Sequence, residues 1–172
     1  MDTLILLNKS GDKIGLTDKL SAHEHGMLHM AFSIVLLQST KAGIMTLIQQ
    51  RSSAKYHGPG LWSNTCCSHF LPDLDFTERL NQRLAFEMGI NAELEYCGQY
   101  YYKAKVSSLT EHELDYIYFG WSDLTPSPNA DEVMAYKWVN LHELLEESQD
   151  TSKYTPWLNG VLTKVADKLS RL

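Results

Sequence analysis

Two short segments of this 172-residue chain place ionisable side chains at alternating positions. The first contains Cys67 and His69, and the second contains Glu111 and Glu113. Side chains two residues apart in a β-strand point to the same face of the sheet. Ionisable groups on an inward face are unfavourable unless they are paired or bound to a metal, so such groups usually have a use. The spacing therefore predicts two strands that direct a thiol, an imidazole and two carboxylates toward one site.

The length and charge of the chain limit its fold and its partners. A chain of 172 residues buries a sizeable core but is short for two domains, so we expect one domain spanning 1–172. The net charge of −6 leaves few basic residues to neutralise phosphates, so we expect no nucleic-acid partner. We expect no membrane partner either, because the apolar runs are far too short to span a bilayer. The first residues do not combine a basic region with a following apolar stretch, and two of the three cysteines are adjacent. We therefore expect a soluble, cytoplasmic protein with reduced thiols.

Hydrophobic periodicity predicts an α/β domain in which helices pack on a sheet. Two apolar runs around the turn sequence NKSGD indicate a hairpin at the N-terminus. The segment 75–88 has apolar residues four apart and ends before Gly89, which is typical of an amphipathic helix with a glycine stop. The expected strands are 3–7, 13–16, 30–38, 44–50, 92–106, 113–121 and 133–139, and the expected helices are 75–88, 141–147 and 156–172.

A histidine-rich segment just before the strand at 30–38 supplies candidate metal ligands. His23, His25 and His29 fall within seven residues, and neutral imidazole is a common transition-metal ligand. Gly26 and the adjoining strand favour a loop here, so the spacing alone leaves His23 and His25 as alternatives. For any one histidine a solvated loop is the plainer interpretation. The candidate nitrogen and oxygen site, suited to Mn, Zn or Mg, consists of His23 or His25, His29, His69, Glu111 and Glu113.

Cys67 and its neighbour Cys66 point to opposite faces of the predicted strand. A buried cysteine is more often a small apolar residue than a reactive group. Beside His69 and a carboxylate, Cys67 becomes a candidate ionisable thiol in a cleft. Cys66 is then the natural comparison for it.

Basic residues occur near these segments in an otherwise acidic protein. Arginine offers a planar fork and lysine a point charge, and the two together suit the oxygens of a diphosphate. For Arg83, an ion pair with Glu87 four residues further along the helix is an equally good interpretation. The candidate basic residues are Lys19, Arg51, Lys55 and Arg83.

Several motifs occur in order along almost the whole chain. They include LHMAFS at 28–33, NTCCSH at 64–69, EHELDY at 111–116 and TPW at 155–157. In these motifs the chain resembles type I isopentenyl-diphosphate delta-isomerase, a relative of the Nudix hydrolases. The resemblance implies a Nudix-like mixed β-sheet sandwiched by helices, with an extra N-terminal hairpin. It also implies an isomerase of isoprenoid biosynthesis that interconverts isopentenyl and dimethylallyl diphosphate by protonation and deprotonation through a tertiary carbocation.

The resemblance further implies roles for individual residues. Cys67 and Glu113 match the acid and base of the family, with Tyr102 assisting Glu113. One divalent metal, Mn, Zn or Mg, is implied at His23, His29, His69, Glu111 and Glu113. A Mg ion that accompanies the substrate diphosphate is implied near Glu87. The implied substrate-binding residues are Lys19, Arg51, Lys55, Arg83, Ser68 and Trp157.

The chain departs from the family pattern at three places. The interval from His23 to His29 differs by a residue or so among members, which leaves His25 as an alternative ligand. Phe70 follows His69, where members commonly have proline. The helix at 75–88 lacks the consecutive glutamates of a full Nudix box, which argues against diphosphate hydrolysis. The alternatives are a Nudix-type diphosphohydrolase and a non-enzymatic module that binds metal or prenyl diphosphate. The expected partner is a small prenyl diphosphate, and the protein is expected to be a monomer or a weak dimer.

Overall fold

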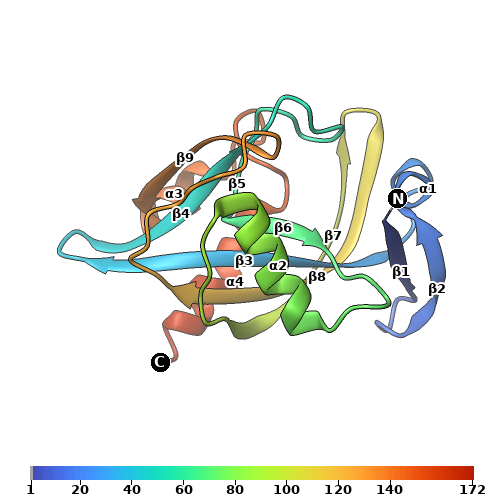
Figure 1. Ribbon diagram of the computed structural model, residues 1–172, viewed down its shortest axis with the longest axis horizontal. Coiled ribbons are helices and arrows are strands. Elements are labelled where there is room, and N and C mark those ends of the chain that lie inside the picture. Colours follow the sequence, from blue (N-terminus) through green and yellow to red (C-terminus); the bar gives the residue numbers. More distant parts are fainter. Residues whose placement is uncertain (1) are drawn as a thin grey trace.

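The computed structural model describes residues 2–172 and shows a mixed β-sheet with helices on both faces (Figure 1). Its strands are β1 (Thr3–Leu7), β2 (Lys13–Asp18), β3 (His29–Thr40), β4 (Gly43–Arg51), β5 (Trp62–Ser63), β6 (Cys66–His69), β7 (Glu95–Val106), β8 (Leu109–Trp121) and β9 (Val133–Asn140). Its helices are α1 (Lys19–Glu24), α2 (Phe76–Met88), α3 (Leu141–Glu147) and α4 (Leu158–Leu169).

Strand β3 is the centre of the sheet. Its residues from His29 to Leu37 are all buried. A strand covered on both faces has a near-continuous apolar sequence, as HMAFSIVLL nearly does. β3 pairs in parallel with β8 and antiparallel with β1, β4 and β6. Every strand that carries a candidate site residue therefore lies next to β3 or one strand away from it.

Two apolar cores lie on opposite faces of the sheet. Along β3, even-numbered residues such as Phe32 and Ile34 enter the core beneath α2. Odd-numbered residues such as Val35 and Leu37 enter the core covered by α3 and α4. In Figure 1, α2 lies in front of the sheet and α4 lies behind it. This alternation along β3 fixes which side chains can reach each face.

The ends of α2 show why its prediction from sequence was right. At its start, the Asp75 carboxylate accepts a hydrogen bond from the backbone N–H of Glu78, which is a typical N-cap. At its end, Gly89 takes the left-handed conformation with φ 66°. Residues with a β-carbon adopt that conformation at a cost, so glycine is preferred there.

The predicted α/β class, mixed sheet and N-terminal hairpin are confirmed. The loop expected before β3 is wrong, because residues 19–24 form α1. Its cap is Asp18, which accepts hydrogen bonds from the backbone N–H of Ser21 at 2.9 Å and from its hydroxyl at 2.6 Å. The helix expected at 156–172 is also too long. Its start is delayed to Leu158, because the backbone of Thr155 is hydrogen-bonded to Trp62 in β5.

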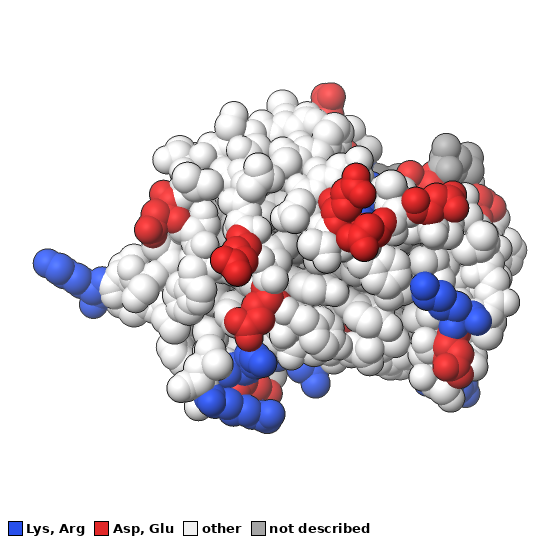
Figure 2. All heavy atoms as spheres, turned by 60° about the horizontal axis from the view of Figure 1, so that its bottom comes forward, with Lys and Arg blue, Asp and Glu red and all other residues white. Residues whose placement is uncertain are grey.

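On the surface that Figure 2 shows, the charged side chains of this acidic protein occur singly and in small groups. On that face, acidic and basic side chains are interspersed among uncharged residues. A net charge of −6 agrees with the absence of a continuous basic patch on this face. Across residues 2–172, none of the helices has both the length and the apolar composition needed to span a bilayer.

We expect Gly89→Ala to lower the free energy of unfolding by about 2 kcal/mol or more. A Cβ at this position would lie 2.3 Å from the backbone oxygen of Ser127, in addition to the strain of a positive φ. Urea unfolding followed by circular dichroism measures the loss. Gly60→Ala is the matched control, because Gly60 also has a positive φ of 75° but has open space where its Cβ would lie. Equal losses in the two variants would contradict the clash with Ser127.

Candidate active site

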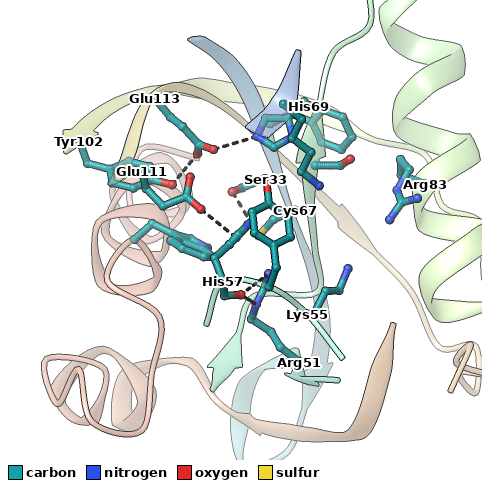
Figure 3. A pocket seen from close by; sticks show the side chains of 15 residues that line it. Ser33, Arg51, Lys55, His57, Cys67, His69, Arg83, Tyr102, Glu111 and Glu113 are labelled. Atoms are coloured by element: carbon teal, nitrogen blue, oxygen red, sulfur yellow. Dashed lines mark hydrogen bonds and ion pairs between the residues drawn. The ribbon is translucent and has the colours of Figure 1, made fainter. Parts of the chain in front are cut away.

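Strand register brings the candidate residues onto one face of the sheet. β3 and β8 pair so that His29 lies opposite Glu113. β3 and β6 pair so that Ser33 lies opposite Cys67. β7 pairs with the other edge of β8, and there Tyr102 of β7 also lies opposite Glu113. Because paired residues share a face, imidazole, thiol, phenol and carboxylate meet at one end of the sheet (Figure 3).

The short helix α1 adds His23 to this face. The His23 Nε2 atom lies 3.1 Å from Glu111 Oε2, and Nδ1 lies 2.6 Å from the carbonyl oxygen of Lys19. Burial lowers the pKa of His23, but Glu111 and the Lys19 carbonyl outweigh it, so the net shift is upward. His25 lies on the surface after α1, where its Nδ1 faces the carbonyl oxygen of Ser21 at 3.0 Å. Of the two alternatives, the structure places His23 in the cluster and His25 outside it.

Glu113 lies between two imidazoles and a phenol. Its Oε1 is 3.1 Å from His69 Nε2 and 3.3 Å from His29 Nε2. Tyr102 donates a hydrogen bond to its Oε2 (Figure 3). Burial raises the pKa of Glu113, but its contacts with His29 and His69 outweigh burial and hold the pKa well below its usual range. The carboxylate is therefore ionised at neutral pH.

The donor atoms of this cluster have the spacing of a metal site. One nitrogen each from His23, His29 and His69 and one oxygen from Glu113 lie within 4.8 Å of one another. His29 Nε2 and Glu111 Oε1 are buried and have no hydrogen-bond partner in the described part of the chain, which is unfavourable unless an ion binds them. Burial lowers the pKa of His69 to about 4, so this imidazole is neutral, as a metal ligand must be. The residues present fit a divalent ion.

His57, which the sequence did not predict, joins this cluster from the loop after β4. Its Nδ1 lies 2.9 Å from Glu111 Oε1. His23, His57 and Glu111 form a second group whose donor atoms lie within 4.8 Å of one another. Burial lowers the pKa of His57. The glycines and proline of its segment, YHGPG, indicate only a loop, so no periodic pattern pointed to a site.

Cys67 faces the pocket and is held by a buried asparagine. Its Sγ donates a hydrogen bond to Asn64 Oδ1 at 2.8 Å, and the Ser33 hydroxyl lies 3.7 Å from the sulfur. Burial raises the pKa of the thiol to about 12, and the nearby Asp115 adds to the rise. Cys67 is therefore a neutral thiol at neutral pH. Cys66 points the other way, into the apolar core beneath α2.

Ser33 and Asp115 form a buried pair beside Cys67 that was not predicted. The Ser33 hydroxyl donates a hydrogen bond to Asp115 Oδ2 at 2.7 Å. Burial raises the pKa of Asp115 well above its usual range. Asp115 continues the alternation of Glu111 and Glu113 by one more step along β8. That alternation was the signal in the sequence that could have identified it.

Basic residues surround the rest of the pocket, whose volume is about 570 Å³ including its open mouth. The predicted substrate-binding residues all line it: Lys19, Arg51, Lys55, Arg83, Ser68 and Trp157. Lys55 forms an ion pair with Glu132, and Arg83 Nη2 lies 3.5 Å from the same carboxylate. Burial lowers the pKa of Lys55 to about 8. Glu132 precedes β9 in a loop beside Asp131, and nothing in this short acidic pair singled it out.

Glu87 lies next to this basic region on α2, and only 2% of it is exposed. Arg83 donates a hydrogen bond to its Oε1 at 2.5 Å, and Gln49 donates one to its Oε2 at 2.9 Å. The predicted ion pair of Arg83 with Glu87 is therefore present, and the same arginine side chain also lines the pocket.

Similarity to known proteins places the chain in a family. The NUDIX domain family matches residues 27–158. Isopentenyl-diphosphate Delta-isomerase 2 of Aromatoleum aromaticum is 39% identical over 166 residues, which cover 95% of this chain and 86% of the relative. Isopentenyl-diphosphate Delta-isomerase of Photobacterium profundum is 37% identical over 98% of this chain and 97% of its own length. This chain belongs to the isopentenyl-diphosphate Delta-isomerase family.

Solved structures show that this member of the isomerase family has the Nudix fold. A Deinococcus radiodurans protein superposes with a TM-score of 0.76 at 14% identity, covering 95% of this chain and 98% of its own. An Ap4A hydrolase of C. elegans superposes with a TM-score of 0.61 at 15% identity, covering 83% of this chain and 98% of its own. Similarity at such low sequence identity shows only the fold, because one fold supports many chemistries. The predicted Nudix-like fold is confirmed.

We expect Asn64→Ala to destabilise this isomerase-family chain by roughly 2–4 kcal/mol. Asn64 is fully buried, accepts a hydrogen bond from Cys67, and donates to the carbonyl oxygens of Ile34 and Cys66. Alanine would leave these buried groups without partners. Urea unfolding measures the change. The exposed Asn91→Ala is the control, expected within about 0.5 kcal/mol of wild type, and a similarly small loss for Asn64→Ala would contradict this role.

Proposed function

We propose that this chain interconverts isopentenyl and dimethylallyl diphosphate by moving protons onto and off the carbon skeleton. The main support is a single pocket lined by a neutral thiol, Cys67, and an ionised carboxylate, Glu113. Family membership supports the same reaction, because the curated relatives are named for this isomerase. In this proposal residues 1–172 form one cytoplasmic domain, and a small prenyl diphosphate is the substrate.

Moving the double bond requires one proton to be added and another to be removed. The proton added to the terminal alkene carbon leaves a tertiary cation, and loss of a proton from the carbon nearer the diphosphate forms the new double bond. An unactivated alkene is a weak base, so the reaction needs a positioned acid and a positioned base. Cys67 and Glu113 take these two roles and exchange them when the reaction runs in reverse. Tyr102 holds Glu113 through its hydrogen bond.

The histidine and glutamate cluster is proposed to hold one divalent ion, Mn, Zn or Mg. When bound, the ion would supply positive charge that orients Glu113 and tunes its acidity, rather than activating water. The buried atoms without hydrogen-bond partners support this assignment. The proposed ligands are His23, His29, His69, Glu111 and Glu113.

The basic part of the pocket is proposed to bind the diphosphate. Arginine forks and lysine charges would meet the phosphate oxygens, with a Mg ion near Glu87. The carboxylate of Glu132, which faces Lys55 and Arg83, would give way to the more highly charged diphosphate. The proposed contacts are Lys19, Arg51, Lys55, Arg83 and Ser68.

Trp157 is proposed to stabilise the cationic intermediate. Its Nε1 donates a hydrogen bond to the Ser63 hydroxyl at 3.1 Å, and its ring lies 5.9 Å from that of Tyr102. Both aromatic residues line the pocket. The face of a tryptophan ring can stabilise a desolvated cation by about 2 kcal/mol.

We expect the wild-type chain, with Mg and Mn in deuterated water, to convert isopentenyl diphosphate into deuterium-labelled dimethylallyl diphosphate. Cys67→Ala removes one of the two proton-transfer groups, so the rate should fall by roughly 10²–10⁴-fold or more. Mass spectrometry of the product measures both quantities. Cys66→Ala is the matched control and should stay active, because Cys66 lies on the opposite face of β6.

Other outcomes of this experiment would favour the alternatives. Phosphate release with the alkene unchanged would indicate a diphosphohydrolase, and binding without turnover would indicate a non-enzymatic module. Equal activity in the Cys67 and Cys66 variants would contradict the role of the Cys67 thiol. Hydrolysis is not expected, because α2 places Glu87 beside the pocket without the adjacent glutamates of a full Nudix box.

We expect Glu87→Gln to raise the Mg concentration needed for half-maximal activity by roughly tenfold or more, since a charge-assisted contact of about 1.5–3 kcal/mol is lost. Ion binding at the histidine and glutamate cluster should not change. Steady-state rates over a Mg titration measure the first quantity, and metal content measures the second. Glu78→Gln, on the exposed side of α2, is the control. The same Mg dependence in both variants would rule out the role of Glu87.

A further inference from the structure

His57 places a buried nitrogen atom beside the proposed metal centre. The inference drawn from this position rests on that proposed centre. The residue is only 8% exposed, and its Nδ1 has no hydrogen-bond partner among residues 2–172. The nearest carboxylate oxygen, Glu111 Oε1, likewise has none. Buried polar atoms without partners are unfavourable, so two of them side by side need an explanation. A ligand that contacts both atoms at once would satisfy them.

The distance between these two atoms is that of neighbouring ligands on one ion. Metal bonds of about 2.0–2.2 Å at right angles place two ligand atoms roughly 3 Å apart. His57 Nδ1 and Glu111 Oε1 are 2.9 Å apart but are not aligned for a hydrogen bond. His23 Nε2 completes a group of three donors within 4.8 Å. Proximity without hydrogen-bond alignment favours a shared ion over a direct contact.

The two groups of donor atoms share His23, and only one nitrogen of His23 is available to an ion, so an ion bound there lies beside both groups. An imidazole nitrogen has one lone pair for a metal, and Nδ1 of His23 already faces the carbonyl oxygen of Lys19 at 2.6 Å. Glu111 connects the two groups, with Oε2 near His23 and Oε1 near His57. An ion bound at His23 and Glu111 therefore has His57 as a neighbour.

We propose that His57 Nδ1 is a further ligand of this divalent ion. The centre then offers four imidazole nitrogens and two carboxylates, which are enough donors for octahedral coordination. A higher share of imidazole favours Zn and the later transition metals over Mg, which prefers oxygen ligands. The complete ligand set is His23, His29, His57, His69, Glu111 and Glu113.

The surroundings of His57 hold its ring in place. Arg51 donates two hydrogen bonds, of 3.0 and 3.3 Å, to the backbone carbonyl oxygen of His57. The ring stacks on that of His23, with centroids 5.2 Å apart and planes 19° apart. Tyr56 stands nearly perpendicular to it, with centroids 4.6 Å apart. A side chain that is already fixed loses little conformational entropy when it binds a ligand.

Nitrogen-15 NMR of the histidine-labelled wild-type chain tests this inference without a mutation. One equivalent of Zn²⁺, added to metal-free protein, should shift the ligating ring nitrogens of four histidines. The expected atoms are Nε2 of His23, His29 and His69, and Nδ1 of His57. An unchanged His57 signal while the other three shift would overturn the inference alone. Failure to bind Zn²⁺ at all would contradict the proposed metal centre, and the inference with it.

Variants provide a second test through metal affinity. His57→Ala should weaken Mn²⁺ binding by about tenfold or more in chelator competition, and should change the visible spectrum of bound Co²⁺. His57→Asn should restore neither property, because its amide can form a hydrogen bond but is a weak ligand for these ions. Wild-type affinity in His57→Ala, or recovery in His57→Asn, would overturn ligation by His57. The exposed His25→Ala is the control and should bind Mn²⁺ as wild type does.

Discussion

The parallel pairing of β3 with β8 is the constraint on which the whole site depends. It sets His29 opposite Glu113, while the pairing of β3 with β6 sets Cys67 on the same face. A slip of one residue would turn every side chain of a strand to the other face. Such a slip would carry Phe32 and Ile34 out of the core beneath α2. Apolar packing on one face of β3 therefore fixes the polar chemistry on the other.

Strand β8 carries three carboxyl groups at alternating positions, those of Glu111, Glu113 and Asp115. The residues around each group shift its pKa in different directions. Burial raises the pKa of each one. Contacts with imidazoles outweigh burial at Glu111 and Glu113, and the net pKa shift of both is downward. Asp115 has the Ser33 hydroxyl but no imidazole beside it, and its pKa is raised. Protonation states along β8 are thus set by what the neighbouring elements bring to each position.

The sequence predicted the parts of the site that belong to regular elements. Alternation in β6 and β8 and the glycine stop of α2 are local patterns, and they placed Cys67 and Glu113 correctly on one face. Helix α1 and its cap were not predicted, because six residues show too little hydrophobic periodicity to outweigh the loop that Gly26 indicates. His57 and Glu132 lie in loops, where position depends on tertiary contacts such as the two hydrogen bonds from Arg51 to the His57 carbonyl. Such contacts join residues that no spacing rule connects.

Most of the acidic groups of this site lie on strand β8 rather than on a helix. On α2, Glu87 is buried while Phe86 beside it is half exposed, so the helix offers one inward carboxylate rather than a run of them. The remaining donors come from α1, β3, β6, β8 and the loop after β4, beside the Cys67 thiol. On the sheet, the Glu113 carboxylate shares one pocket with the neutral Cys67 thiol. The chemistry that a Nudix fold supports therefore depends on which side chains line its pocket and not on the backbone alone.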